Sequence, residues 1–156
     1  MFDVKDLIEL LRQNARYTVS ELATMLNSTE KLVEKTMRNL EKSGVISKYT
    51  IIINENKLDD PPATIRALVE VAVHPERDKG FDNIAKMVYK YDNVVDHFLL
   101  SGSYDFLLVI EGKSLQDISD FIASKLSSIK NVKSTRTHFI LKKYKENNIV
   151  LLNNDL

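Results

Sequence analysis

The sequence of 156 residues contains no cysteine, only four glycines and three prolines, and as many acidic as basic side chains. Without cysteine the chain can form no disulfide, no thiolate metal site and no cysteine nucleophile. Its glycines are at least ten residues apart, so a dinucleotide-binding fingerprint, a P-loop and a nucleophile elbow are all excluded. Because the formal net charge is 0, any contact with DNA requires a local basic patch.

The chain also has few histidines and no long apolar run. Its three histidines, His74, His97 and His138, lie far apart in the sequence and form no ligand pair. These absences predict a protein that is not an enzyme and that uses no cofactor and no metal. No apolar run approaches the roughly 20 residues that span a bilayer, and the N-terminus carries acids where a secretory signal carries lysines. We therefore expect a cytoplasmic protein without membrane contact.

What is present has the composition of a globular protein, with 44% hydrophobic and 28% charged residues. Its first sixty residues predict three short helices, the first from Asp3 to Asn14. A capping box at Thr18 begins the second helix, and Asn27 ends it. Ser28 is expected to cap the third helix, which Gly44 ends. Helices joined by such a short turn are typical of a helix-turn-helix unit.

The exposed face of the third helix predicts a DNA interface. With Val33, Met37 and Leu40 turned inward, its outer side chains are of the kinds that reach phosphates and base edges. The expected DNA-binding residues are Ser28, Thr29, Lys31, Lys35, Arg38, Asn39 and Lys42. Residues 28–48 carry five basic and three acidic side chains, a net charge of only +2. A solvated helix of an ordinary protein could carry the same charge, so the prediction depends on the three-helix pattern as well.

The second half of the chain predicts an α+β domain. Residues 49–53 are expected to be extended, as a wing or a hinge strand, and Asp59-Asp60-Pro61-Pro62 marks a boundary. The pattern then predicts strand, helix, two strands, helix and strand, a ferredoxin-like βαββαβ order, over residues 64–74, 77–91, 94–100, 104–111, 115–129 and 132–144. The expected divisions are a helix-turn-helix domain (1–47), a hinge strand and linker (48–62), a ferredoxin-like domain (63–145) and a tail (146–156).

Two of the predicted strands are continuously apolar. The runs Phe98–Leu100 and Phe106–Ile110 do not alternate, which indicates burial on both faces of the sheet. The sequence has no spare helix to cover the second face, and so large an apolar patch is unusual on a soluble monomer. A second copy of the same sheet is the natural cover. We therefore expect an isologous homodimer, whose paired helix-turn-helix units read two half-sites in DNA.

Three segments together resemble the Lrp/AsnC, or feast/famine, family of transcription regulators. They are Leu40–Ile46 followed by Tyr49, the stretch Ser101–Leu108 with its Gly-Ser-Tyr-Asp turn, and the strand Val132–Thr137. The resemblance implies a winged helix-turn-helix domain joined by a hinge strand to a ferredoxin-like regulatory domain. It also implies double-stranded DNA as a partner, dimers that assemble further into tetramers or octamers, and an amino-acid effector bound near the Gly-x-Tyr-Asp turn.

Carried over to this chain, the candidate effector-binding residues are Gly102, Ser103, Tyr104, Asp105, Ser134, Thr135 and Thr137. The Asp105 carboxylate could pair with an α-ammonium group, and the hydroxyls could hold the α-carboxylate. A plain hairpin turn explains Gly102 and Ser103 equally well, but explains Tyr104 and Asp105 less well.

Two other functions stay open on the sequence. Thr36 stands where the family usually has an arginine, so the chain could be a metabolite-binding assembly protein that does not read DNA. An enzyme on the same architecture, for example one that handles a tetrapyrrole, would need clustered histidines or arginines. The expected strand order instead places His97 and His138 on opposite sheet edges. The apolar run Ile149–Leu152 in the tail is expected either to dock on a neighbour or to fray.

Overall fold

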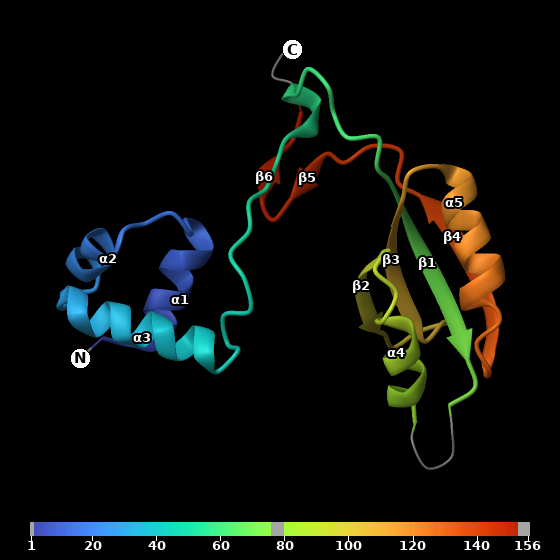
Figure 1. Cartoon of the computed structure of the whole chain (residues 1–156), viewed down its shortest axis with the longest axis horizontal. Coiled ribbons are helices and arrows are strands. Elements are labelled where there is room, and N and C mark those ends of the chain that lie inside the picture. Colours follow the sequence, from blue (N-terminus) through green and yellow to red (C-terminus); the bar gives the residue numbers. More distant parts are fainter. Residues whose placement is uncertain (1, 76–79, 153–156) are drawn as a thin grey trace. The chain divides into compact units, whose positions relative to one another are not determined.

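The computed structural model describes residues 2–75 and 80–152 and divides into two units, Met1–Ile53 and Asn54–Leu156 (Figure 1). Each unit has a hydrophobic core of its own. The division falls inside the predicted linker 48–62. Residues 77–79 of the helix predicted over 77–91 lie outside the described residues.

The first unit consists of three helices, α1 (Val4–Gln13), α2 (Val19–Met25) and α3 (Glu30–Lys42), as predicted. Their apolar faces meet in a core of Leu7, Leu11, Leu22, Ala23 and Val33. The capping box of α2 is confirmed, because the Glu21 amide donates to Thr18 Oγ1 and the Thr18 amide donates to Glu21 Oε2. The Thr18 hydroxyl also donates to Glu21 Oε2, and the hydrogen bonds that the Thr18 amide and hydroxyl donate to this carboxylate lower the pKa of Glu21.

The turn between α2 and α3 corrects one prediction. Asn27 takes a left-handed φ of 47° and ends α2, but the cap of α3 is Thr29 and not Ser28. The Ser28 amide still donates to the Ala23 carbonyl at 2.8 Å, so Ser28 belongs to the exit of α2. Thr29 has the extended backbone that a cap needs, and its Oγ1 accepts from the Leu32 amide at 3.4 Å. Gly44, with a φ of +77°, follows the end of α3 as expected.

The strand predicted over residues 49–53 is not formed in this chain. Residues 47–54 belong to no helix or strand. The segment is nevertheless apolar, and Ile51 in its middle is 72% exposed. A strand requires a backbone partner, and none pairs with this segment among the described residues. A wing or hinge strand here therefore depends on something outside the single chain.

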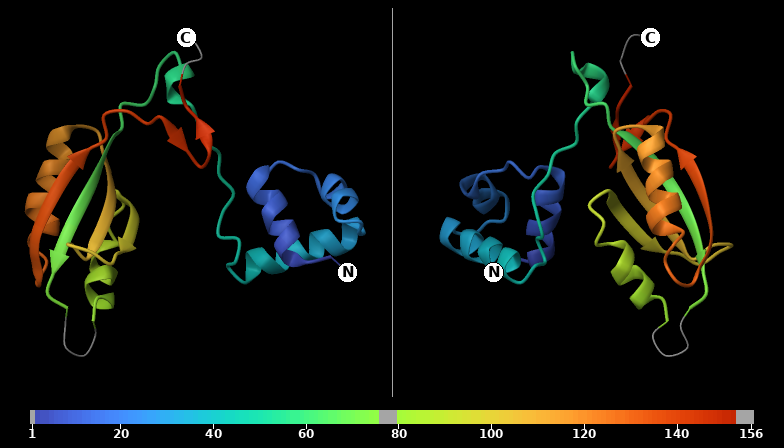
Figure 2. Two further views of the ribbon diagram at one scale, coloured as in Figure 1. Left: turned by 180° about the vertical axis from the view of Figure 1, so that it is seen from behind. Right: turned by 45° about the vertical axis from the view of Figure 1, so that its right-hand side comes forward.

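The second unit is the predicted ferredoxin-like α+β fold. Its elements are β1 (Ile65–Val73), α4 (Asp82–Val88), β2 (Val94–Leu99), β3 (Phe106–Gly112), α5 (Leu115–Phe121) continued by the π-helical turn η2 (Ile122–Leu126), and β4 (Val132–Phe139). The four strands form one antiparallel sheet in the order β2-β3-β1-β4. Figure 2 shows α4 and α5 on the same face of this sheet. As expected, β2 with His97 and β4 with His138 are the two edges.

The helix-covered face of the sheet carries the core. Every second residue of β1, from Ala67 to Val73, is buried, and β3 contributes Phe106, Leu108 and Ile110. These side chains pack against Ile84 and other apolar residues of the helices. The alternation leaves the other half of each central strand on the opposite face, here called the outer face.

The end of the chain differs from the prediction. The last strand was expected to reach residue 144 but ends at Phe139. Its partner β1 begins at Ile65, so no residue of β1 remains to pair with residues after Ile140. The last bond between the two is the one that the Ile140 amide donates to the Arg66 carbonyl. Residues 145–150 then form a hairpin of β5 (Lys145–Glu146) and β6 (Ile149–Val150). Its two turn residues, Asn147 and Asn148, have φ values of 42° and 68°, as a type I′ turn requires.

Candidate nucleic-acid interface and effector site

The expected DNA-binding residues lie on and just before α3. Val33 is fully buried and Met37 and Leu40 are partly buried against the first core, which turns the opposite side of the helix outward. The exposed members of the predicted set are Thr29, Lys31, Lys35, Arg38, Asn39 and Lys42. Ser28 is partly buried and is held by the turn. That these residues bind DNA stays a prediction, and their exposure is consistent with it.

The acidic residue Glu34 on α3 is paired within the unit. Arg38 Nη2 lies 2.6 Å from Glu34 Oε1, and both side chains are more than half exposed. An exposed pair of this kind contributes at most about 1 kcal/mol, so a DNA phosphate can replace Glu34 at little cost. Thr36 donates its hydroxyl to the Leu32 carbonyl at 2.8 Å. Thr36 therefore bonds to its own helix rather than to a partner outside it.

Tyr49 makes a contact that the sequence did not suggest. Its hydroxyl donates to Glu41 Oε1 at 2.9 Å, which ties the start of the linker to the last turn of α3. Partial burial raises the pKa of Tyr49, and the hydrogen bond to the Glu41 carboxylate raises it further. The tyrosine therefore remains a hydrogen-bond donor at neutral pH. Like Glu34, Glu41 thus has a partner inside the unit.

The predicted effector turn, residues 101–105, joins β2 to β3. Its carboxylate is already in use, because Asp105 Oδ2 accepts the Val73 amide at 2.8 Å. The Asp105 amide also donates to the Val71 carbonyl at 3.1 Å. Val73 lies at the register shift of the β1–β4 pairing, between Ala72 and Val73. Asp105 therefore accepts a hydrogen bond from a backbone amide at an irregular point of the sheet, which is a structural role that explains an aspartate here.

The three β4 residues of the predicted site do not share a face. Thr135 and Thr137 pair with Val71 and Val69, whose side chains lie in the core, and both threonines are partly buried. Ser134 pairs with Ala72, so its exposed side chain lies on the outer face. Asp105 and Thr135 lie on either side of the end of β1, about 9–10 Å apart by strand spacing. The prediction thus grouped residues near one end of the sheet, although alternation along the predicted strand already separates Ser134 from Thr135 and Thr137.

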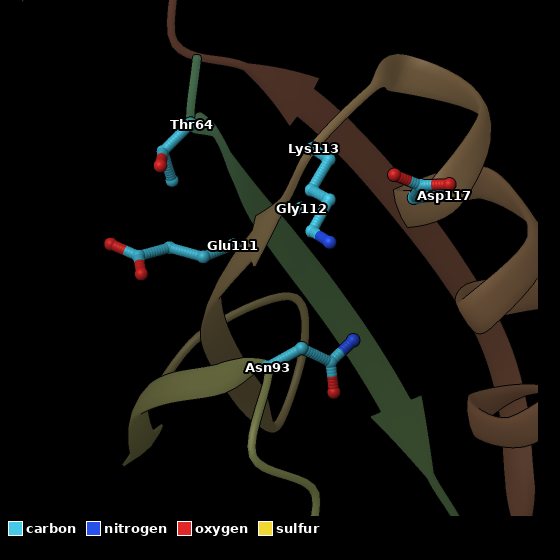
Figure 3. A pocket seen from close by; sticks show the side chains of 6 residues that line it. All are labelled: Thr64, Asn93, Glu111, Gly112, Lys113 and Asp117. Atoms are coloured by element: carbon cyan, nitrogen blue, oxygen red, sulfur yellow. The ribbon is translucent and has the colours of Figure 1, made fainter. Parts of the chain in front are cut away.

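A hollow lies at the opposite end of the sheet (Figure 3). It has a volume of about 510 Å³ and is lined by Thr64, Asn93, Glu111, Gly112, Lys113 and Asp117. Glu111 pairs with Arg66, and Gly112 pairs with Ile65 at the start of β1, whereas the predicted effector turn lies at its end. None of the predicted effector residues lines this hollow.

Other site classes find no support in residues 2–75 and 80–152. That part of the chain contains no group of three or more His, Asp or Glu side chains placed to hold a metal. No helix within it has the length and apolar character needed to span a membrane.

A three-helix unit with its own core and an exposed helix α3, followed by an antiparallel α+β domain, is the organisation of a two-domain helix-turn-helix regulator. The sequence profile of winged helix-turn-helix DNA-binding domains matches residues 4–47, and that of the Lrp/AsnC ligand binding domain matches residues 66–150. The chain belongs to the Lrp/AsnC family of transcriptional regulators.

Individual relatives agree along nearly the whole chain. It is 37% identical over 150 residues to the HTH-type transcriptional regulator YugG of Bacillus subtilis, covering 96% of this chain and 90% of YugG. It is 33% identical over 147 residues to the regulator LrpA of Pyrococcus horikoshii, covering 93% of this chain and 100% of LrpA. The crystal structure of PH0061, at 26% identity, covers 94% of this chain and 97% of its own, with a TM-score of 0.75.

A further structure has the same fold at lower identity. It is the Neisseria meningitidis regulator NMB0573 in complex with L-Met, which is 23% identical with a TM-score of 0.71 and covers 94% of each chain. At this identity the match shows the fold alone.

Proposed function

We propose that this regulator binds double-stranded DNA through α3 as a homodimer or a larger assembly up to an octamer, and that an amino acid or a similar small metabolite modulates the binding. The observation that carries the DNA contact is the exposed basic face of α3 on a unit with its own core. Two such units, related by a twofold axis, would read half-sites about one helical turn apart.

The outer face of the sheet supports the dimer. It is apolar at its centre, where Leu68 of β1 lies beside Val109 of β3 in register, and Leu107 is paired with Phe98 of β2. Phe98 is 47% exposed, and the other three are partly exposed. Both helices lie on the opposite face (Figure 2). Because the described chain offers no cover, a second copy of the same face is the proposed partner.

Charged pairs flank this apolar centre. Glu70 Oε1 lies 3.1 Å from His138 Nε2 and its Oε2 lies 3.6 Å from Arg136 Nη1, while Arg66 pairs with Glu111. These pairs use partners from the same chain, so the charges need no partner from the second copy when the face is covered.

The proposed effector is an amino acid, and its proposed location is the turn that contains the exposed Gly102 and the partly buried Tyr104. The support is chemical and comparative: NMB0573 and a feast or famine regulatory protein of Mycobacterium tuberculosis, Rv3291c, have the same fold and were crystallised with L-methionine. A Cβ at Gly102 would meet no atom within 4 Å, so the turn has open space beside it. One oxygen of the Asp105 carboxylate already accepts the Val73 amide. The ligand would therefore bind next to this hydrogen bond, at the end of β1, and Asp105 would not be free to bind the ligand alone.

The test is binding of the purified protein to DNA from upstream of its own gene, with competitor DNA and with separate pools of amino acids. The proposal expects specific binding that one pool alters, with the protein behaving as a dimer or larger in light scattering. Specific binding that no pool changes would contradict the effector, and a monomer that binds equally well would contradict the dimer.

A further inference from the structure

The tail residues 145–152 contact the part of the predicted linker that belongs to the second unit. Asn56 Nδ2 donates to the Leu151 carbonyl at 2.8 Å, a hydrogen bond between residues 95 positions apart in the chain. Leu151 is only 3% exposed and belongs to neither of the two main cores. Its amide donates in turn to the Tyr144 carbonyl at 2.9 Å, so the β5–β6 hairpin holds Leu151 in place.

The segment that Asn56 belongs to is itself ordered by local bonds. Asn54 Oδ1 accepts the Asn56 amide at 3.2 Å and caps the short 3₁₀ helix η1 (Glu55–Lys57). The Lys57 and Leu58 amides donate to the carbonyls of Asn54 and Glu55. One isolated turn of 3₁₀ helix is not stable in water, so an outside contact such as the one to Leu151 is needed to keep it formed.

The other end of the linker is also held. Tyr49 bonds to Glu41 of α3, within the first unit. Residues 50–53 then lie between the two anchored points, and the division between the units falls at Ile53 and Asn54. Four extended residues span at most about 14 Å, whereas the fifteen residues from 50 to 64 would span about 50 Å if Asn56 were released.

We propose that residues 145–152 act as a clamp on residues 54–58, so that the DNA-binding unit moves on residues 50–53 only. The clamp sets the length of the joint between the two units. Its effect on DNA reading rests on the proposed DNA-binding function, because a shorter joint restricts the separations that two α3 helices can reach in a dimer. The clamp itself can be tested without DNA, so the two proposals can fail separately.

The first test is hydrogen exchange at the Lys57 and Leu58 amides in the full chain. Asn56→Ala removes the bond to Leu151, and Asn148→Val disfavours the positive φ of the hairpin turn. Each is expected to speed exchange at these amides about two- to tenfold, the equivalent of one hydrogen bond, without changing exchange in β1. Two matched controls, the exposed neighbour change Lys57→Ala and the turn-compatible change Asn148→Gly, are expected to keep the original rate.

The proposal is overturned if Asn56→Ala and Asn148→Val leave exchange at residues 54–58 unchanged. It is also overturned if Asn148→Gly accelerates exchange as much as Asn148→Val does. A second measurement uses the lack of native cysteine: Arg12→Cys and Lys113→Cys, both at exposed positions, carry a fluorescent donor and acceptor on the two units. With one labelled chain per assembly, the distance distribution is expected to widen with Asn148→Val but not with Asn148→Gly, and equal widths would contradict the clamp.

Discussion

The two units expose surfaces of opposite chemistry. On α3 the exposed side chains are mainly charged and polar, with four basic and three acidic residues, and the ion pair of Arg38 with Glu34 is weak enough to be exchanged for a phosphate. On the outer face of the sheet the centre is apolar, and Glu70 and Glu111 are paired within the chain. This difference indicates that α3 is suited to a charged partner whose binding depends on salt, and that the outer face of the sheet is suited to a second protein surface.

The largest expected effect tests the apolar surface. Leu107→Asp places a carboxylate at the centre of the outer face, where dimer formation would bury it without a partner. We expect a monomer in light scattering and a large loss of DNA affinity, because the two heads are no longer joined. Leu141→Asp is the matched control, since Leu141 is 96% exposed and lies outside the sheet. Dimers of the Leu107→Asp protein would show that the face is not the interface.

The next prediction tests the structural role of Asp105 in the predicted effector turn, which belongs to neither of the two surfaces. Asp105→Ala leaves the Val73 amide without its acceptor, and we expect the free energy of unfolding to fall by about 1–3 kcal/mol. Asp105→Asn keeps an oxygen acceptor and should lose less. Urea unfolding at fixed protein concentration measures both. If Asp105→Ala were as stable as the parent, the bond to Val73 would not be what holds this aspartate.

A smaller effect tests the charged surface. Arg38→Ala is expected to weaken DNA binding and to reduce the slope of log affinity against log salt by about 1, as for one lost phosphate contact. Stability should stay within about 0.5 kcal/mol, because the pair with Glu34 is exposed. Binding titrations at several salt concentrations provide the measurement. The control is Thr36→Ser, a change at a partly buried position of the same helix that keeps the hydroxyl. An unchanged slope would mean that Arg38 does not contact phosphate.

The smallest expected effect is a pH dependence of the stability of the second unit. His97 is half-buried against Phe106, with ring centroids 4.8 Å apart, and its Nε2 has no hydrogen-bond partner. Burial lowers the pKa of His97 below its ordinary value of 6.5. The unfolded chain therefore binds the proton at His97 first, so the contribution of His97 to stability is fully present above pH 6.5 and is lost as the pH drops below it. Unfolding at pH 7.5 and 5.5 should show a smaller pH dependence in His97→Phe; an equal dependence would assign the titration to other groups.

The fold was largely predictable because its signals are local. The capping box at Thr18, the left-handed Asn27 and the glycine after α3 each act within a few residues, and the alternation of β1 reports its buried face directly. The βαββαβ order follows from these periodicities. The cap of α3 was misplaced by one residue because both Ser28 and Thr29 can cap, and only the exit geometry of α2 decides between them.

The site was less predictable because its hydrogen bonds connect distant residues. Nothing near Asp105 in the sequence indicates that its carboxylate accepts the Val73 amide. Strand alternation does predict that Ser134 faces away from Thr135, but only the pairing with β1 assigns Thr135 to the core face. The β5–β6 hairpin did have a local signal, since two asparagines between short apolar or charged pairs favour a type I′ turn. That signal was missed, and the burial of Leu151 had none.

The sequence by itself determined the two-unit organisation, the order of helices and strands, the outward face of α3 and the need to cover an apolar sheet face. Periodicity and capping are properties of neighbouring residues, so they can be read without coordinates. The tertiary structure alone decided that Asp105 bonds to Val73, that Thr135 and Thr137 lie on the core face of the sheet, and that Asn56 meets Leu151. Those contacts depend on strand register and chain return, which bring together residues that the sequence keeps apart.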